Sequence, residues 1–365
     1  MKTVREEFLW KIEKVRNLVI EKEVGGIEVK TQANFAWLTC GGRGFINVAS
    51  EGACASIVVS LDQVYLLTNR IEASRLLAEE LSEIADAMQI HVFPWEELDG
   101  ENPSYIRKIL NGKPYLTDEK LAPEFVRMRS CLTALEIERY TALGLESARC
   151  LENVCRNLRP GVSEFETAGL LCKEVWDCGI EPIVSLVAFD ERIELFRHPL
   201  PTAKRLAKTA MVVLCARRYG LIASCTRLVS IGEVSPELAR KHQSVAKIDA
   251  RYICGTKPGV KIGEVLLDAM EAYREEGYAD EWKLHHQGGL AGYNTREIFG
   301  TAQCEEIVLA NQVFAWNPSI TGTKSEDSIL VTESGNKVLT HTGEYAYVSV
   351  QCGADTLLRP DILKL

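Results

Sequence analysis

The sequence predicts an α/β protein of two domains, one small and one large, which is the usual arrangement for a chain of 365 residues. Between residues 25 and 123, short apolar runs alternate with helical stretches, a pattern typical of a small α/β domain. A second, helix-rich composition begins near Arg129. We therefore place an N-terminal domain at residues 1–128 and a second domain at residues 129–365.

The second domain contains an internal repeat. The tripeptide Pro-Gly-Val occurs at residues 160–162 and again at residues 258–260, each time between two helical segments. Pro and Gly are common after any helix, so the tripeptide alone is a weak signal. Two copies of one unit, in which a helix, a turn and a helix are followed by strands, predict an α+β domain with pseudo-two-fold symmetry.

The first domain begins with an amphipathic helix over residues 1–23. Charges lie throughout this segment, so we do not expect it to be a signal peptide. Its apolar positions recur at helical spacing: Phe8, Ile12, Val15 and Val19. The elements expected after it are a hairpin around Asp62 and Gln63, a helix at residues 71–84 and a strand at residues 90–93.

Helix-start signals organise the second domain. Thr133 with Glu136, and Ser163 with Glu166, have the spacing of capping boxes, in which each side chain satisfies a free backbone N–H group. Further elements follow in this order: a strand at 183–189, a hairpin at 211–232, helices at 236–253 and 262–276, and a strand at 328–332.

Composition excludes several classes of function. The net charge of -9 and the absence of a Lys/Arg block argue against a nucleic-acid partner. No apolar run approaches the roughly 20 residues that span a membrane, so we expect no membrane partner. The twelve cysteines form no C-x-x-C pair and no zinc-type cluster. Reduced thiols and a cytoplasmic location are the expectation.

The hairpin at residues 211–232, MVVLCARRYGLIASCTRLVSIG, resembles a known one. Its Gly220, Thr226 and Arg227 stand where creatinases, prolidases, aminopeptidases P and methionine aminopeptidases carry the same residues. These proteins are the pita-bread metallopeptidases. Further landmarks follow in the family's order: Arg159-Pro160-Gly161, His198-Pro199, Lys257-Pro258-Gly259, Gly288 to Gly292, Asn317-Pro318 and Glu326-Asp327. The resemblance implies a creatinase-like N-terminal domain, a pita-bread domain and a homodimer.

The resemblance also implies a pair of metal ions, but the ligands that hold them map poorly onto this chain. The ligand positions of the family fall on Val213, Ser224, Gly289, Asn317 and Glu326. Glu326 alone is a carboxylate there. Two divalent ions facing one carboxylate would be buried charges without compensation, which costs several kcal/mol or more. We therefore expect no metal and no cofactor.

Chemistry without metal is expected to centre on His198, which stands where the resemblance implies a catalytic histidine. As in creatinase, it would act as general acid and base, because an imidazole exchanges protons near neutral pH. Arg296 would anchor an anion, and Glu326 would bind a cation or orient His198. His285 and His286 are adjacent, so on a strand only one of them can face the site.

Four further residues are candidates for binding substrate: Arg43, Glu297, Asn317 and Arg227. Arg43 lies on a glycine-rich turn and would reach the pocket of a neighbouring subunit, although a solvated arginine is the plainer interpretation. Arg227 would brace the site, and pairing with Glu326 is the alternative that we expect for it.

Three functions remain open. The first is a divergent Xaa-Pro peptidase or creatinase-like protein that hydrolyses a C–N bond in a small peptide-like or amidino substrate without metal. The second is a non-catalytic pseudo-peptidase that binds a small molecule or a protein partner. The third is a conventional Xaa-Pro dipeptidase or aminopeptidase.

Overall fold

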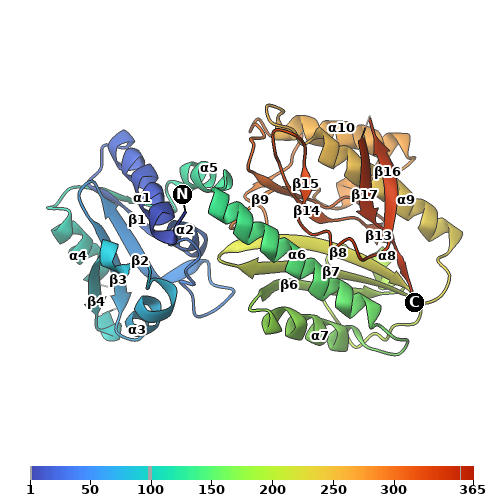
Figure 1. Ribbon diagram of the computed structural model, residues 1–365, viewed down its shortest axis with the longest axis horizontal. Helices are drawn as coiled ribbons and strands as arrows, with labels where there is room; N and C mark the ends of the chain where they lie inside the picture. Colours follow the sequence, from blue (N-terminus) through green and yellow to red (C-terminus); the bar gives the residue numbers. More distant parts are fainter. Residues whose placement is uncertain (1, 98–100, 354) are drawn as a thin grey trace. The chain divides into compact units, whose positions relative to one another are not determined.

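The computed structural model describes residues 2–97, 101–353 and 355–365, and the chain forms two compact units (Figure 1). The first unit comprises the residues up to Ile137 together with Tyr219–Leu221. The second comprises Glu138–Arg218 and Ile222–Leu365. Within the described residues, no helix is both long and apolar enough to cross a membrane.

The first unit is a five-stranded sheet with helices. Its strand order is β4-β3-β2-β1-β5, in which the inner pairs run antiparallel and the two edge strands run parallel to their neighbours. The strands are β1 Gly26–Thr31, β2 Gly52–Ser60, β3 Val64–Asn69, β4 Gln89–Phe93 and β5 Tyr115–Thr117. The helices are α1 Val4–Glu21, α2 Gln32–Leu38, α3 Ala73–Arg75, η1 Leu76–Glu80, η2 Ala85–Ala87, η3 Trp95–Glu97, α4 Glu101–Ile109 and α5 Ala122–Ser130.

The predicted amphipathic helix α1 is confirmed, whereas the predicted helix at 71–84 is wrong in detail. The apolar face of α1 is buried, and Thr3 caps its N-terminus by accepting from the N–H of Glu6. Residues 71–84 form only a short helix that widens into a π-helical turn, with the Leu81 N–H bonded to the Leu76 carbonyl. This turn presents Glu80 to the backbone N–H of Arg43 at 2.9 Å.

The second unit contains six helical segments and four small sheets among its described residues. The helices are α6 Ala134–Arg156, which begins at the border of the units, α7 Glu164–Asp177, α8 Arg192–Leu195, α9 Pro236–Gly255, α10 Ile262–Glu275 and η4 Glu281–Leu284. Both predicted capping boxes are present, at Thr133 with Glu136 and at Ser163 with Glu166.

The largest sheets of the second unit have the orders β18-β8-β7-β6 and β10-β9-β11-β14-β15, and two hairpins complete it (Figure 1). The strands are β6 Glu181–Phe189, β7 Thr209–Arg218, β8 Leu221–Ser230, β9 Gly288–Ala291, β10 Ile298–Phe299, β11 Val313–Trp316, β12 Ser319–Ile320, β13 Thr323–Lys324, β14 Asp327–Leu330, β15 Lys337–Val338, β16 Tyr347–Cys352, β17 Asp355–Pro360 and β18 Leu363–Lys364.

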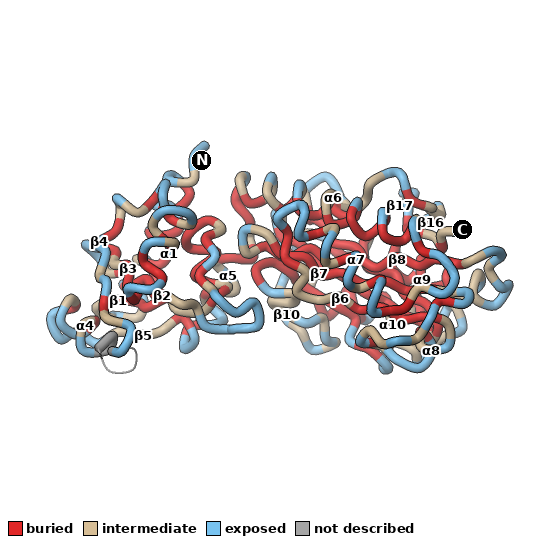
Figure 2. The backbone as a smooth tube through the Cα atoms, turned by 90° about the horizontal axis from the view of Figure 1, so that it is seen from below, coloured by how far each residue is buried: buried red, intermediate tan, exposed pale blue. Residues whose placement is uncertain are grey.

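The predicted hairpin at 211–232 is formed by β7 and β8. Its turn residues Tyr219 and Gly220 have φ angles of 55° and 77°, the left-handed pair that suits a two-residue hairpin turn. Every residue of β8 is buried, and Figure 2 shows the two strands running through the interior of their unit. Strands that are buried on both faces have nearly continuous apolar sequences, which explains why this hairpin could be predicted from the sequence.

The predicted internal repeat appears as a repeated pattern of hydrogen bonds. Gly161 donates its N–H to the carbonyl of Leu206, and Gly259 donates to Val308. An isolated β-bridge follows in each half, at Ser163 with Arg205 and at Lys261 with Ile307. Both glycines have φ near 90°, a backbone shape that disfavours other residues. Each half thus consists of two helices followed by a set of strands.

A buried network of charges ties β14 to the rest of the second unit. Asp327 accepts from Arg227 at 3.1 Å and from Arg359 at 2.6 Å. Arg359 also donates to Asp249 on α9 at 2.9 Å, and Arg227 donates to Glu152 on α6 at 3.2 Å. All five side chains are buried, so each charge depends on its partners for compensation.

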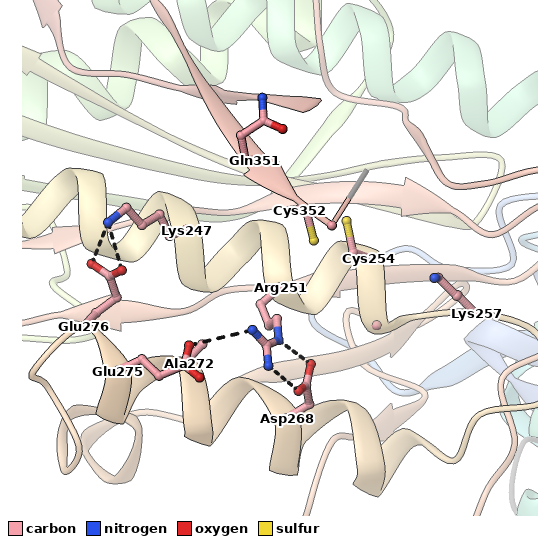
Figure 3. Close-up of a pocket in the computed structure, with 12 residues that line it drawn as sticks. Lys247, Arg251, Cys254, Lys257, Asp268, Ala272, Glu275, Glu276, Gln351 and Cys352 are labelled. Atoms are coloured by element: carbon pink, nitrogen blue, oxygen red, sulfur yellow. Dashed lines mark hydrogen bonds and ion pairs between the residues drawn. The ribbon is translucent and has the colours of Figure 1, made fainter. Parts of the chain in front are cut away.

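Replacing one member of this network should cost much stability. We expect Arg359→Met to lower the free energy of unfolding by about 3–5 kcal/mol, because Asp249 and Asp327 stay buried with fewer partners. Arg251→Met is the matched control, since Arg251 pairs with Asp268 at a surface pocket (Figure 3) and should lose at most about 1 kcal/mol. Urea unfolding followed by tryptophan fluorescence measures both. Equal losses of stability in the two variants would contradict the role of the buried network in holding the unit together.

Candidate functional site

The candidate site lies where the two largest sheets of the second unit meet. The backbone N–H of Thr226 on β8 donates to the carbonyl of Glu326, just before β14, at 3.1 Å. The hydroxyl of Ser328 on β14 accepts from the N–H of Ser224 at 2.9 Å and donates to the Ser224 carbonyl at 3.1 Å. These bonds fix the end of β14 against the hairpin.

Glu326 lies between two cations at this junction. Lys324 Nζ is 2.8 Å from one carboxylate oxygen, and a guanidinium nitrogen of Arg296 is 3.2 Å from the other. The Thr226 hydroxyl donates to the same carboxylate at 2.7 Å. Burial by itself would raise the pKa of Glu326, but Lys324 and Arg296 together lower it to about 2. Glu326 is therefore ionised and engaged at both oxygens.

The other four predicted ligand positions carry no ionisable group. Val213 lies on β7, and Ser224 donates its hydroxyl to the sulfur of Cys215 at 3.3 Å. Gly289 on β9 has φ of 148°, and a Cβ added there would approach the Ile298 carbonyl oxygen to 2.2 Å. This backbone therefore accommodates only glycine.

Asn317 and Arg296 each present a buried polar atom without a hydrogen-bond partner. Asn317 follows β11 and is bound by its backbone N–H to the carbonyl of Gln287, while its side-chain Oδ1 has no partner. The Nε of Arg296 likewise has none, although its other nitrogens bind Glu326 and the Thr295 carbonyl. An acceptor and a donor are thus left for a ligand, since buried polar groups are normally paired.

Two of the predicted substrate-binding residues have structural roles instead. Arg227 is fully buried and forms a structural ion pair, the role we expect for it, but its partners are Glu152 and Asp327 and not Glu326. Glu326 precedes the first residue of β14, Asp327, and successive side chains of an extended chain face opposite ways, so Arg227 contacts Asp327 and not Glu326. Glu297 accepts from the backbone N–H of Tyr293 at 3.0 Å and shapes its own loop.

Arg43 belongs to the first unit, where its guanidinium pairs with Glu80 at 2.8 Å while its side chain remains about half exposed. Its predicted contact with the pocket of a second subunit stays a prediction.

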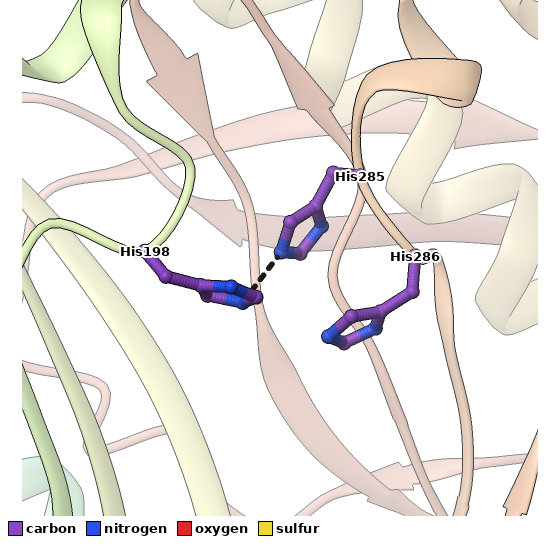
Figure 4. A group of neighbouring side chains, drawn as sticks. All are labelled: His198, His285 and His286. Atoms are coloured by element: carbon purple, nitrogen blue, oxygen red, sulfur yellow. Dashed lines mark hydrogen bonds between the residues drawn. The ribbon is translucent and has the colours of Figure 1, made fainter.

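Three histidines gather near this site (Figure 4). His198 follows α8, while His285 and His286 lie between η4 and β9. The Nε2 atoms of His198 and His285 are 3.0 Å apart, and the rings of His285 and His286 stack at a centroid distance of 4.4 Å. Residues 285–287 do not form a strand, so the rule that only one histidine of the doublet can face the site does not apply, and both lie near His198.

All three imidazoles are held in the neutral form. Burial, reinforced by the charge of Lys324, lowers the pKa of His198 below its ordinary value and that of His285 to about 2. Burial, together with Arg296 and Lys324, lowers the pKa of His286 to about 4. His285 and Lys324 line the same small cavity, so the histidines and the Glu326 cluster adjoin. A neutral imidazole has a free lone pair that accepts a proton or binds an electrophile.

A second pocket lies apart from these groups, between α9, α10 and the end of β16 (Figure 3). It encloses about 560 Å³. Its charged side chains pair with one another, Lys247 with Glu276 and Arg251 with Asp268. The unpartnered buried polar atoms and the neutral histidines make the Glu326 junction the better candidate site.

Comparison with known proteins identifies the family. Residues 138–333 match the sequence profile of metallopeptidase family M24. The chain belongs to this family. The M24 assignment confirms the resemblance seen in the sequence, and the pita-bread fold with it. An uncharacterised peptidase of Staphylococcus epidermidis is 24% identical over 254 residues, which cover 67% of this chain and 71% of that relative.

Solved structures of the same fold extend over nearly the whole chain. The prolidase from Pyrococcus horikoshii OT3 has a TM-score of 0.75 at 18% identity, covering 91% of this chain and 98% of that one. The N-terminal domain of the FACT complex subunit SPT16 from chickpea has a TM-score of 0.67 at 16% identity, covering 93% and 96%. At such identities these likenesses establish the M24 fold alone.

The cation pair around Glu326 leads to a test. We expect Glu326→Gln to lower the free energy of unfolding near neutral pH by about 3–5 kcal/mol, because Lys324 and Arg296 remain buried without their carboxylate. The folded pKa of about 2 lies below the ordinary 4.5. The contribution of Glu326 is therefore complete above about pH 4.5 and is lost as the pH falls toward 2.

Urea unfolding of both proteins at a series of pH values measures this difference. Glu305→Gln is the control, since Glu305 pairs with Lys261 at an exposed position and should matter little at any pH. A loss for Glu326→Gln that stays constant from neutral pH down to the acid limit would contradict the assignment.

Proposed function

We propose that the chain hydrolyses a C–N bond in a small peptide-like or amidino substrate without the two-metal centre of its family. The observation that carries the proposal is Glu326, whose two carboxylate oxygens are bound by Lys324 and Arg296. Those cations supply the positive charge that metal ions would otherwise bring to this carboxylate.

A pair of divalent ions does not fit these residues. The positions aligned with the metal ligands of the family hold Val213, Ser224, Gly289 and Asn317 beside Glu326. Hard and borderline cations need several carboxylate or imidazole ligands, and only Glu326 is of that kind. Two ions would also meet the buried charges of Lys324 and Arg296 at close range, which adds repulsion that nothing nearby offsets.

The unpartnered atoms suggest how a substrate binds. Asn317 Oδ1 is placed to accept an N–H group, and Arg296 Nε to donate to a carbonyl oxygen. An amide offers both atoms close together, and an amidino group offers the same N–H donor with an imine nitrogen as the acceptor. A hydrogen bond from a guanidinium to the carbonyl oxygen also stabilises the negative charge that develops there when water attacks.

His198 supplies the proton transfers in this proposal. Its neutral imidazole takes a proton from a water molecule whose oxygen attacks the carbon of the C–N bond. The imidazolium then returns that proton to the leaving nitrogen as the bond breaks, so the cycle ends with neutral His198. The burial that lowers the pKa of His198 keeps it ready as a base at neutral pH.

Binding without catalysis is the second candidate. The likeness to the SPT16 domain favours it, because that protein is a subunit of a complex. A conventional Xaa-Pro peptidase is the third, and it would require metal at the Glu326 junction. The homodimer, the cytoplasmic location and the domain border near Arg129 stay predictions.

Kinetics of His198→Asn separate these functions. With a panel of short peptides, Xaa-Pro dipeptides and amidino compounds, we expect kcat to fall by about 10²–10⁴-fold while KM changes little. In the unsubstituted protein, kcat/KM should be constant at neutral pH and decline as the pH drops through the lowered pKa of His198, since protonation removes the base.

His91→Asn is the control, because His91 stacks on Tyr105 in the first unit. Full turnover by His198→Asn would remove His198 from the mechanism. Ligand binding without turnover by the unsubstituted chain would favour the second candidate.

A further inference from the structure

The three histidines form a compact set of nitrogen ligands. One ring nitrogen from each of His198, His285 and His286 lies within 4.8 Å of the others, and His198 and His285 approach to 3.0 Å. In a tetrahedral zinc site with Zn–N bonds of 2.0–2.1 Å, two nitrogen ligands stand about 3.3 Å apart. Two of the rings are therefore close to that spacing, and the third needs a shift of roughly 1–1.5 Å.

Inside the cluster, the Nε2 atoms of His198 and His285 share one hydrogen bond, which a bound ion would replace. His198 and His286 are the exposed members of the cluster drawn in Figure 4, so solvent reaches it from their side. His285 is 8% exposed, and its Nδ1 is buried without a hydrogen-bond partner. Burying an imidazole nitrogen without a hydrogen-bond partner costs free energy, which points to a role other than packing.

We propose that His198, His285 and His286 bind one late first-row transition-metal ion, such as zinc or cobalt, at a site separate from the two-metal centre of the family. Three imidazoles with an open fourth position suit such an ion, whereas magnesium and calcium prefer oxygen ligands. His198 and His286 form the exposed side of the site, where a water molecule can be the fourth ligand.

Nearby charges limit the affinity. Lys324 lines the same small cavity as His285, and Arg296 acts on His286, so two cations repel an incoming ion. Glu326 is the carboxylate that acts on all three rings, and it attracts the ion. Three coordinate bonds must outweigh the remaining repulsion, which predicts binding weaker than in a site with carboxylate neighbours.

The site has a consequence for the proposed hydrolysis, and this part rests on the proposed function. An ion bound to Nε2 of His198 occupies the lone pair that would otherwise take a proton from water. Zinc should therefore inhibit turnover.

Cobalt titration of the full chain tests the site directly. Cobalt(II) in a tetrahedral nitrogen site shows visible absorption bands, and calorimetry gives the stoichiometry. We expect one ion per chain, and binding weakened by about 100-fold or more in His198→Asn and in His286→Asn, since each loses a ligand. Both side chains are exposed, so the fold should survive, which a melting curve verifies.

His91→Asn is the control that removes one histidine from elsewhere and should bind cobalt like the unsubstituted chain. Absence of the bands, or equal binding by His198→Asn, overturns the site. Assays of turnover with added zinc keep the two proposals apart. Metal binding without inhibition would leave the site standing and remove His198 as the base. If turnover depends on His198 but the chain binds no cobalt, His198 remains the base and the metal site is overturned.

Discussion

The ion triad of Lys324, Glu326 and Arg296 is the constraint on which the site depends. In a buried junction, a carboxylate needs positive charge beside it, and two side chains of this chain supply that charge at 2.8 and 3.2 Å. With Glu326 compensated internally, its buried charge does not require a bound cation. The junction does not need a set of charged ligands to stay folded. Uncharged side chains are therefore compatible with it at the other aligned positions, which are Val213, Ser224, Gly289 and Asn317.

The buried ion pairs of Asp327 fix the position of this triad. Glu326 precedes Asp327 at the start of β14, and the alternation of a strand turns one carboxylate toward the site and the other toward Arg227 and Arg359. Burial would raise the pKa of Asp327, but the two arginines hold it well below its usual range. The position of Glu326 is therefore fixed by the structural carboxylate of Asp327 beside it, and loss of the ion pairs of Asp327 should disturb those of Glu326.

Much of the fold could be predicted from the sequence, because its signals are local. Capping boxes at Thr133 and Ser163, the apolar hairpin strands and the repeated Pro-Gly-Val each specify a nearby element. The site could be predicted only in part. Lys324 stands two residues before Glu326, and side chains at i and i+2 of an extended segment share a face, so this pairing was a signal in the sequence that the motif comparison missed.

Two departures from expectation at the site have related causes. The partner of Arg227 differs from the expected one because Glu326 and the first residue of β14, Asp327, face opposite ways, and the strand rule for the doublet at 285–286 does not apply because these residues do not lie in a strand. The most direct test of the account is the number of manganese, cobalt or zinc ions bound by the double variant His198→Asn/His286→Asn, in which every ligand position of the family centre is intact. The account predicts none. Two ions per chain would contradict it and would restore an ordinary two-metal peptidase.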